Sequence, residues 1–383
     1  MSPLPAAADV VVVGGGVIGT SVAFHLAEAG VDVCLLERDQ LAGGSTSRAA
    51  GGIRAQFSDP LNIAIGLRSI EAFARFGERP GAEIDFHQVG YLFLLDRQED
   101  VAAFERSVEL QNELGVPSRF VPLEEVAELC PPAGLDGVLA ATYSPLDGHA
   151  SPESVVQGYG AGARTYGATI VTRCAADRIV VERGEIRGVE TAEGTIETGI
   201  VVCAAGVWSP DLARTAGVEL PVVPYLREVG FTGPAAGITD RIPLTIDFST
   251  GFYFHREGPG LLFGMADRGQ PPGLDAPTDP DWLVNVLEVA ERRCPLLLDL
   301  GIAGGWKGAY EVTPDHNALV GESREAARLL YATGFSGHGF LQGPAVGEIV
   351  RDLVLGRTPF LDVAPLSAER FADASLRPEH NVI

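Results

Sequence analysis

The stretch VVVVGGGVIGTSVAFHLAEAGVDVCLLE, residues 10–37, decides the fold of this chain. Its β-branched start predicts a strand over 9–13, and the helix formers after the glycines predict a helix over 17–29. Gly30 ends that helix, and the apolar run after it predicts a second strand over 31–36. Two strands joined by a helix make a βαβ unit, so we expect an α/β protein.

The glycines of this unit have the spacing of a dinucleotide-binding fingerprint. Gly14, Gly16 and Gly19 stand at GxGxxG spacing between the predicted strand and helix, and Glu37 closes the second strand. Gly14 permits a tight turn, Gly16 lets backbone amides approach a pyrophosphate, and Gly19 lets the helix pack close to the strand. Glu37 can accept hydrogen bonds from an adenosine ribose. The motif favours a dinucleotide site over the alternative of a glycine turn that binds no ligand. It does not distinguish FAD from NAD.

The composition is that of an acidic globular protein. With 383 residues, 46% of them apolar, the chain is long enough for two domains that share one cofactor. The formal charge of −23 argues against a nucleic-acid or anionic-membrane partner, because both need a basic surface. The apolar run 10–26 is interrupted by glycines and follows no basic residue, so we do not expect a signal or membrane segment.

The five cysteines are an odd number without CxxC spacing, which fits neither a disulfide framework nor a zinc site. We therefore expect reduced core thiols, a cytoplasmic location and no metal.

Further along, the chain leaves the nucleotide-binding pattern and returns to it. Residues 71–129 are charged and helical apart from a strand at 89–95, and residues 167–206 predict a meander followed by a parallel strand ending at Gly206. Residues 220–266 are rich in strands and include a hairpin, and a helix is expected over 281–293.

Four further segments carry a resemblance to a known family: GSTSRAAGGIR (44–54), CAAGVWSPDL (203–212), LPVVPYLREVGF (220–231) and GFSGHGFLQGPAVGEIV (334–350). Together with the fingerprint they resemble the D-amino-acid oxidase superfamily. Within it the chain looks most like the sarcosine oxidase and glycine oxidase group, including β subunits of sarcosine oxidases and proline dehydrogenases.

The resemblance implies an FAD enzyme that oxidises the C–N bond of an amino acid or of a secondary or N-methyl amine. A hydride would pass to flavin N5, and water would hydrolyse the resulting imine. The implied fold is α/β, with a Rossmann-type FAD-binding domain interleaved with an antiparallel-sheet α+β substrate domain. The expected FAD-binding ranges are 1–80, 145–218 and 316–383, and the expected substrate ranges are 81–144 and 219–315.

Carried over residue by residue, the family pattern places Glu37 on the ribose and the backbone of Cys174 on the adenine. The GFSGHGF segment is expected as a glycine-rich turn that opens a helix over 345–355, whose dipole would stabilise a reduced flavin. The implied cofactor-binding residues are Gly14, Gly16, Val17, Ile18, Gly19, Glu37, Arg38, Ser45, Ser47, Arg48, Ala49, Gly51, Gly52, Ile53, Cys174, Ala204, Ala205, Gly206, Trp208, Gly334, Gly337, His338, Gly339, Phe340 and Leu341.

The same resemblance implies a substrate pocket. Arg54 matches an arginine that receives a substrate carboxylate with its two-pronged guanidinium. Tyr310 and Tyr253 match aromatic residues that line the pocket, and His338 is expected beside the flavin. The alternatives are a surface arginine and tyrosines that only pack in the core.

The sequence also departs from the family pattern at several positions. Where relatives have a second lysine that binds the substrate carboxylate, this chain has Leu341. Where relatives have a lysine and a histidine in the hairpin, it has Leu262 and Ala266. Losing the cation associated with oxygen activation makes an acceptor other than O₂ an alternative. The residues that tether flavin in relatives fall on Gly308 and Arg48, so FAD is expected to be bound non-covalently.

The sequence is compatible with two other functions. One is a flavin-dependent aromatic hydroxylase, although ATGFSGHGF occupies the place of its usual GD motif. The other is a flavoprotein subunit or assembly factor with little activity of its own, in a homo- or hetero-oligomer. His149, His255 and His316 are nominal bases, each expected in a turn or at the surface.

Overall fold

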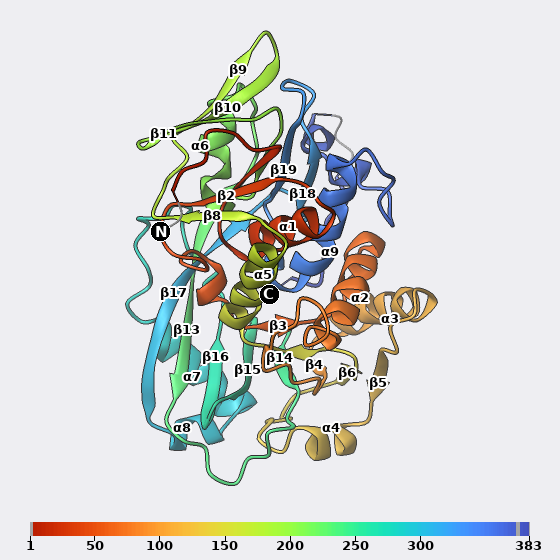
Figure 1. Cartoon of the computed structure of the whole chain (residues 1–383). Helices are drawn as coiled ribbons and strands as arrows, with labels where there is room; N and C mark the ends of the chain where they lie inside the picture. Colours follow the sequence, from red (N-terminus) through yellow and green to blue (C-terminus); the bar gives the residue numbers. More distant parts are fainter. Residues whose placement is uncertain (1–2, 373–375, 383) are drawn as a thin grey trace.

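A computed structural model describes residues 3–372 and 376–382, and two large sheets dominate it (Figure 1). The first has six strands in the order β18-β19-β12-β1-β2-β8, and all neighbours are parallel except the antiparallel edge strand β18. Its strands are β1 (Val10–Val13), β2 (Val33–Glu37), β8 (Thr169–Thr172), β12 (Val201–Cys203), β18 (Leu319–Glu322) and β19 (Leu329–Thr333).

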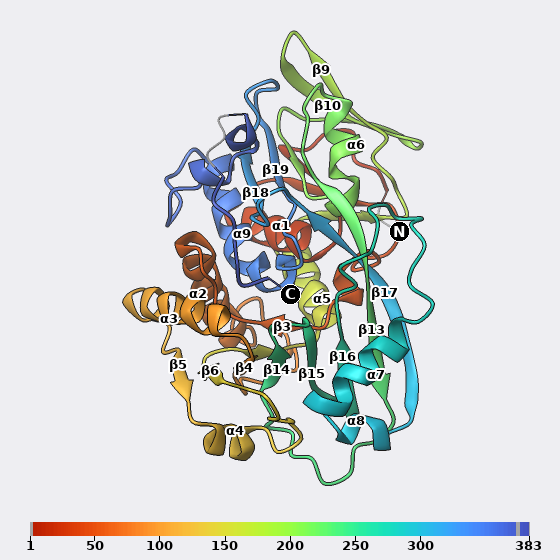
Figure 2. The ribbon, with the colours of Figure 1, turned by 180° about the vertical axis from the view of Figure 1, so that it is seen from behind.

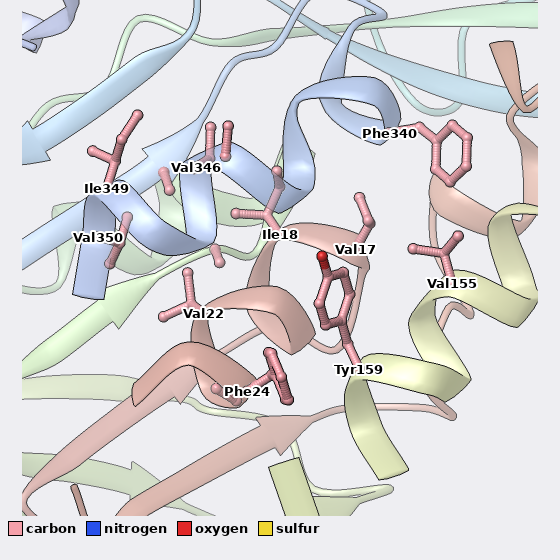
Figure 3. Packing of buried hydrophobic residues seen from close by; sticks show 14 of the residues in the cluster. Val17, Ile18, Val22, Phe24, Val155, Tyr159, Phe340, Val346, Ile349 and Val350 are labelled. Atoms are coloured by element: carbon pink, nitrogen blue, oxygen red, sulfur yellow. The ribbon is translucent and has the colours of Figure 1, made fainter. Parts of the chain in front are cut away.

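The helices α1 (Val17–Glu28), α5 (Pro152–Thr165) and α9 (Gly339–Val354) cover one face of this sheet, and α2 (Pro60–Ala74) packs against α9. Every residue of α1 from Val17 to Ala27 is buried, as expected of a helix that is apolar all round. Figure 3 shows its side chains packed against those of α5 and α9. A Cβ on Gly347 would overlap Ser21 of α1, so this glycine permits the close approach of α9 to α1.

The other face is covered by a three-stranded meander and a short helix. The elements are β9 (Arg178–Glu182), β10 (Glu185–Thr191), β11 (Gly194–Glu197) and α6 (Ser209–Arg214). Ile179, Val189 and Ile196 of the meander pack with Val11 and Leu36 of the sheet. The parallel strands are therefore covered on both sides, which explains why their sequences are continuously apolar.

The second large sheet has eight strands in the order β17-β13-β16-β15-β14-β4-β6-β5, and only β14 and β4 pair in parallel. Figure 2 shows α7 and α8 lying across this sheet. Its strands are β4 (Tyr91–Leu95), β5 (Arg119–Val121), β6 (Ala140–Ser144), β13 (Val223–Thr232), β14 (Leu244–Asp247), β15 (Phe252–Glu257), β16 (Gly260–Gly264) and β17 (Ile302–Val312), with α3 (Gln98–Glu113), α4 (Leu123–Leu129), α7 (Trp282–Arg293) and α8 (Leu296–Asp299) nearby.

Small elements complete the fold. β3 (Gly52–Ile53) pairs with β7 (Gly148–His149), and four 3₁₀ turns are Thr46–Arg48, Gly206–Trp208, Ala364–Leu366 and Ala368–Phe371. All five cysteines are buried free thiols. No helix in the described part of the chain is long and apolar enough to cross a membrane.

The α/β fold class is confirmed, and two predicted element ends are wrong by three residues or more. α9 begins at Gly339, six residues before the predicted start, and includes Pro344. Pro344 is the sixth residue of the helix, where it cannot donate to the carbonyl of Phe340, and the amide of Ala345 beside it donates to Ser69 Oγ at 3.2 Å. β12 ends at Cys203 and not at Gly206, because residues 204–206 leave the sheet.

The six-stranded sheet draws its strands from the ranges predicted for FAD binding, and the eight-stranded sheet from those predicted for the substrate. The domain boundaries themselves stay a prediction.

Candidate cofactor and substrate site

A cavity of about 450 Å³ is lined by both large sheets and by the loops between them. Val13 and Leu36, at the carboxyl ends of β1 and β2, line it, as is usual for ligand sites of open α/β sheets. We call the part around Gly14, Glu37 and Trp208 the nucleotide end. We call the part formed by Arg54, Tyr91, Arg227, Tyr253 and Tyr310 the substrate end.

Backbone geometry shapes the nucleotide end. Gly14 has a φ of +117°, and a Cβ there would overlap the carbonyl oxygen of Ala204. A Cβ on Gly19 would overlap the carbonyl of Gly14, so Gly19 acts through packing. The Glu37 carboxylate accepts hydrogen bonds of 2.7 Å from the amides of Gly15 and Asp39. These bonds hold the carboxylate against the glycine turn, where a ribose would lie.

The outer wall of the nucleotide end is aromatic and charged. The guanidinium of Arg38 lies 3.5 Å from the centre of the Trp208 ring, and both residues line the cavity. Cys174, expected at the adenine, does not line the cavity, whereas Ala175, Ala176 and Asp177 do. The amide of Cys174 is already bonded to the carbonyl of Glu37, at 2.9 Å.

Two long helices start at the cavity. Val17 and Ile18 in the first turn of α1, and Gly339 to Leu341 in the first turn of α9, line it. Neither N-cap residue makes a side-chain capping bond, so most of the first amides have no partner within the helix. Free amides and the helix dipole favour negative charge. This donor set fits the pyrophosphate and flavin of FAD.

Arg54 is the most deeply buried cation of the substrate end, at 2% exposure. It donates from Nη1 to the carbonyl of Gln56, and from Nη2 to the carbonyl of Asn381 at 2.6 Å. Nη2 also lies 3.2 Å from His338 Nε2, and the guanidinium lies 4.0 Å from the centre of the Phe57 ring. Arg54 is thus held by three polar contacts where it lines the cavity.

A buried carboxylate fixes the backbone beside Arg54. Asp147 accepts hydrogen bonds of 3.0 Å from the amide of Ala55 and from Nε2 of Gln56. Burial raises the pKa of Asp147 to about 7, against the opposing effect of these bonds and of the charge on Arg54. Burial thus favours the protonated form of Asp147 at a higher pH than for an exposed carboxyl group.

His338 is neutral in this environment. Burial first, and then the charges of Arg54 and His316, hold the pKa of His338 well below its usual value. Its Nε2 therefore accepts the hydrogen bond from Arg54, which makes His338 a positioning group for that arginine.

Three tyrosines enclose the substrate end: Tyr91, Tyr253 and Tyr310 all line the cavity. Burial raises the pKa of each, so all three hydroxyls stay neutral. The guanidinium of Arg227, on β13, lies 5.4 Å from the centre of the Tyr310 ring. Arg227 was not among the predicted site residues.

Residues 376–382 also contribute to the site. The Glu379 carboxylate accepts bonds from the amides of Ser58 and Asp59 and from the side chain of Asn62. These bonds hold Asn381 beside Arg54. The sequence gave no signal for this segment, because Arg54 and the partners of the Glu379 carboxylate lie more than 300 residues away.

All but five of the predicted site residues line the cavity, and their roles stay predictions. The exceptions are Gly19, Ser47, Ile53, Cys174 and Gly334. Ile53 belongs to the core, and Gly334 has a φ of +71° at a turn. Unpredicted lining residues include Gly15, Thr46, Tyr91, Asp177, Arg227, Leu244, Glu311 and Ser336.

The expectation that His149 and His255 lie in turns or at the surface is wrong. Both are buried on strands, and their rings lie 4.5 Å apart. Burial lowers the pKa of His149 to about 2 and that of His255 to about 4. Neither residue lines the cavity, so neither is a base for a ligand there. His316 is partly buried.

A family model described as "DAO: FAD dependent oxidoreductase" matches residues 9–353. The chain belongs to this family. Members of the family require FAD, and the glycine turn, Glu37 and the two helix starts are the residues that would hold it. The oxidoreductase assignment and the FAD cofactor predicted from the sequence are confirmed.

Relatives of known sequence and structure agree with this assignment. The chain is 29% identical to mitochondrial dimethylglycine dehydrogenase of Mus musculus, over 95% of the chain and 44% of the relative. It is 31% identical to FAD-dependent oxidoreductase domain-containing protein 1 of Bos taurus, over 99% of the chain and 88% of the relative. The crystal structure of L-proline dehydrogenase from P. horikoshii matches with a TM-score of 0.93 and 35% identity, over 98% of this chain and 100% of that one. The chain thus spans under half of the dehydrogenase from mouse and the whole of the archaeal chain.

Proposed function

We propose that this chain oxidises the C–N bond of an amino acid or of a secondary or N-methyl amine. The observation that carries the proposal is Arg54, a buried guanidinium that lines the same cavity as the dinucleotide fingerprint. The buried ion pairs of the described residues use Arg293 and Arg370, and none uses Arg54. A buried cation without an acidic partner suits an anionic ligand such as a carboxylate. The names of the dehydrogenases that resemble the chain support an amine substrate.

When bound, FAD supplies the acceptor for a hydride from the carbon next to nitrogen. The protein's task is to position that carbon and to exclude water. Arg54 would bind the substrate carboxylate, and Tyr91, Tyr253 and Tyr310 would enclose the amine. Because His338 is neutral and bonded to Arg54, it would orient the arginine and move no proton.

We further propose that FAD is bound non-covalently. Gly308 and Arg48, which take the places of tethering residues, both line the cavity, and neither offers a nucleophile for attachment. Acid precipitation should release all of the flavin into the supernatant. Flavin retained in the pellet would show that another residue forms a tether.

We also propose that the reduced enzyme reacts faster with an electron acceptor other than O₂ than with O₂ itself. Leu262, which takes the place of the lysine associated with oxygen activation, is a buried apolar residue and supplies no cation there. Stopped-flow reoxidation with O₂ should be slower than with an artificial acceptor.

The buried free thiols support the proposed cytoplasmic location.

The test of the main proposal is anaerobic mixing of the FAD-loaded chain with a panel of amines. The panel should contain secondary and N-methyl amino acids and, as matched controls, the same amines without a carboxylate. Bleaching of the flavin absorbance by the carboxylated amines is expected. A fully loaded chain that no amine bleaches would favour the alternative of a subunit or assembly factor with little activity of its own.

A further inference from the structure

Arg227 occupies an open position in the wall of the substrate end. It lies on β13, where its partner on the neighbouring strand β17 is Gly308, which has no side chain to cover it. Residues paired across antiparallel strands share a face, so Arg227 is on the same face as Val229 and Tyr310, which line the cavity. Figures 1 and 2 show β13 and β17 running side by side at this edge of the sheet.

Arg227 also reaches beyond the main cavity. A smaller recess of about 10 Å³ is lined by Arg227, Glu228, Tyr253, Met265, Ala266 and Tyr310. Three of these residues, Arg227, Tyr253 and Tyr310, line the main cavity as well. Arg227 therefore lies at the border of the substrate end.

The charge of Arg227 has no acidic partner among the described residues. Its Nη1 donates 3.0 Å to the carbonyl of Leu226, and its buried Nε has no hydrogen-bond partner. The rings of Tyr225 and Tyr310 lie 5.6 and 5.4 Å from the guanidinium carbon. The adjacent acid, Glu228, pairs with Lys307. In a chain with 51 acidic and 28 basic residues, a half-buried arginine without an acid indicates a place for an anion from outside.

Arg54 and Arg227 differ in the donors that they have left. Arg54 is already bonded to Gln56, Asn381 and His338, whereas Arg227 is bonded to one carbonyl. The phenol of Tyr310 senses both cations: burial raises its pKa, and Arg227 and then Arg54 oppose that rise. The cavity thus presents two separate guanidinium groups near one tyrosine.

We propose that Arg227 binds a second anionic group of the substrate, and that the substrate is an amine carrying two carboxylates. Amino dicarboxylic acids and N-carboxyalkyl amino acids have this chemistry. One carboxylate, next to the reacting carbon, would bind Arg54, and the distal one would bind Arg227. The inference rests on the proposed amine oxidation and adds the substrate class.

The experiment compares substrates with one and two carboxylates in anaerobic flavin reduction. N-methylglycine is set against N-methyl-L-aspartate and N-methyl-L-glutamate, using the FAD-loaded wild type, Arg227→Gln, Arg227→Lys and Arg241→Gln. Arg241 is an exposed loop arginine outside the cavity, so its variant controls for the change in net charge.

In the wild type, a dicarboxylate should reduce the flavin at concentrations at least about tenfold below those of N-methylglycine. Arg227→Gln should remove this preference, with a loss about tenfold larger for the dicarboxylates than for N-methylglycine. Arg227→Lys should retain part of the preference for dicarboxylates, because it keeps the positive charge. The preference should be weaker than in the wild type, because an ammonium lacks the two-pronged geometry of a guanidinium. Arg241→Gln should retain the wild-type preference.

Three results would overturn the proposal: no preference for dicarboxylates in the wild type, an equal loss for both classes in Arg227→Gln, or loss of bound FAD in that variant. If no amine reduces the flavin, the proposed oxidation fails separately. Titrations with acetate, succinate and glutarate, followed by the flavin absorbance, then decide the second site. Tighter binding of the dicarboxylates that Arg227→Gln abolishes supports it, and equal binding refutes it.

Discussion

The two ends of the cavity are built by different means. At the nucleotide end, the backbone of Gly14 to Gly19 shapes the cavity, and the side chains of Glu37, Arg38 and Trp208 complete it. At the substrate end, side chains from five separate segments meet: Arg54, Tyr91, Arg227, Tyr253 and Tyr310. The nucleotide end depends on glycines, which have no side chain, and the substrate end depends on buried charge. Substitutions should therefore change cofactor content at one end and substrate use at the other.

The largest effect is expected from Gly14→Val. The new side chain would overlap the carbonyl of Ala204, and a φ of +117° strains any β-branched residue. Purified protein should contain almost no flavin, measured as the ratio of absorbance at the flavin band to that of the protein. Gly30→Ala is the matched control: its φ is +86°, but no atom lies within 4 Å of the new Cβ. It should cost about 1–2 kcal/mol of stability and keep the flavin. A fully loaded Gly14→Val protein would contradict the backbone account.

Arg54→Ala should lower the apparent affinity for a carboxylated amine by about 2–5 kcal/mol, the range for breaking a buried charge pair. Arg54→Lys should fail to restore it, because the fork that bonds Gln56 and Asn381 is lost. Concentration dependence of flavin reduction measures the change, with an amine that lacks the carboxylate as the control. If the variant loses its flavin or loses both amines equally, Arg54 belongs to the scaffold.

Asp147 should make the stability of the substrate end depend on pH. Its folded pKa of about 7 exceeds the ordinary value of 3.8, so the folded state binds more protons between these values. The free energy of unfolding should therefore fall as pH rises from about 4 to about 7, by at most about 4 kcal/mol, and then level off. Asp147→Asn should flatten this slope in denaturant titrations at several pH values. An unchanged slope would show that Asp147 is ionised throughout.

Glu37→Gln should weaken the binding of FAD by about 1.5–3 kcal/mol, or about ten- to a hundred-fold, because a charge-assisted hydrogen bond is lost. The amide keeps one acceptor for the amide of Gly15 or Asp39, so the fold should be preserved. Fluorescence titration of the flavin-free chain with FAD measures the constant. A dissociation constant equal to that of the wild type would place the ribose elsewhere.

The same contrast explains how much could be predicted from the sequence. The glycine turn of the nucleotide end is local: a strand, the turn, a helix and Glu37 follow one another within residues 10–37, and each has its own signal. The start of α9 was missed because Pro344 normally marks a boundary, whereas here it lies inside the helix.

The substrate end was only partly predictable, because its contacts join distant segments. Arg54 meets His338 and Asn381 across 284 and 327 residues, and no periodicity encodes such pairs. Arg227 stands in a strand whose pattern would suit a solvent-facing arginine equally well. Only its pairing with Gly308 and the neighbouring tyrosines give it a direction.

The reaction rates of the buried thiols with an alkylating reagent can measure how fast their surroundings open. Burial raises the pKa of Cys34 and Cys294 to about 12, so neither presents the thiolate that alkylating reagents attack until its surroundings open. Cys34 and Cys203 report on the core of the six-stranded sheet, and Cys130 and Cys294 on the core beneath α7. Timed alkylation followed by peptide mass spectrometry would thus record two opening rates in one unaltered chain, and added FAD should slow the first pair more than the second.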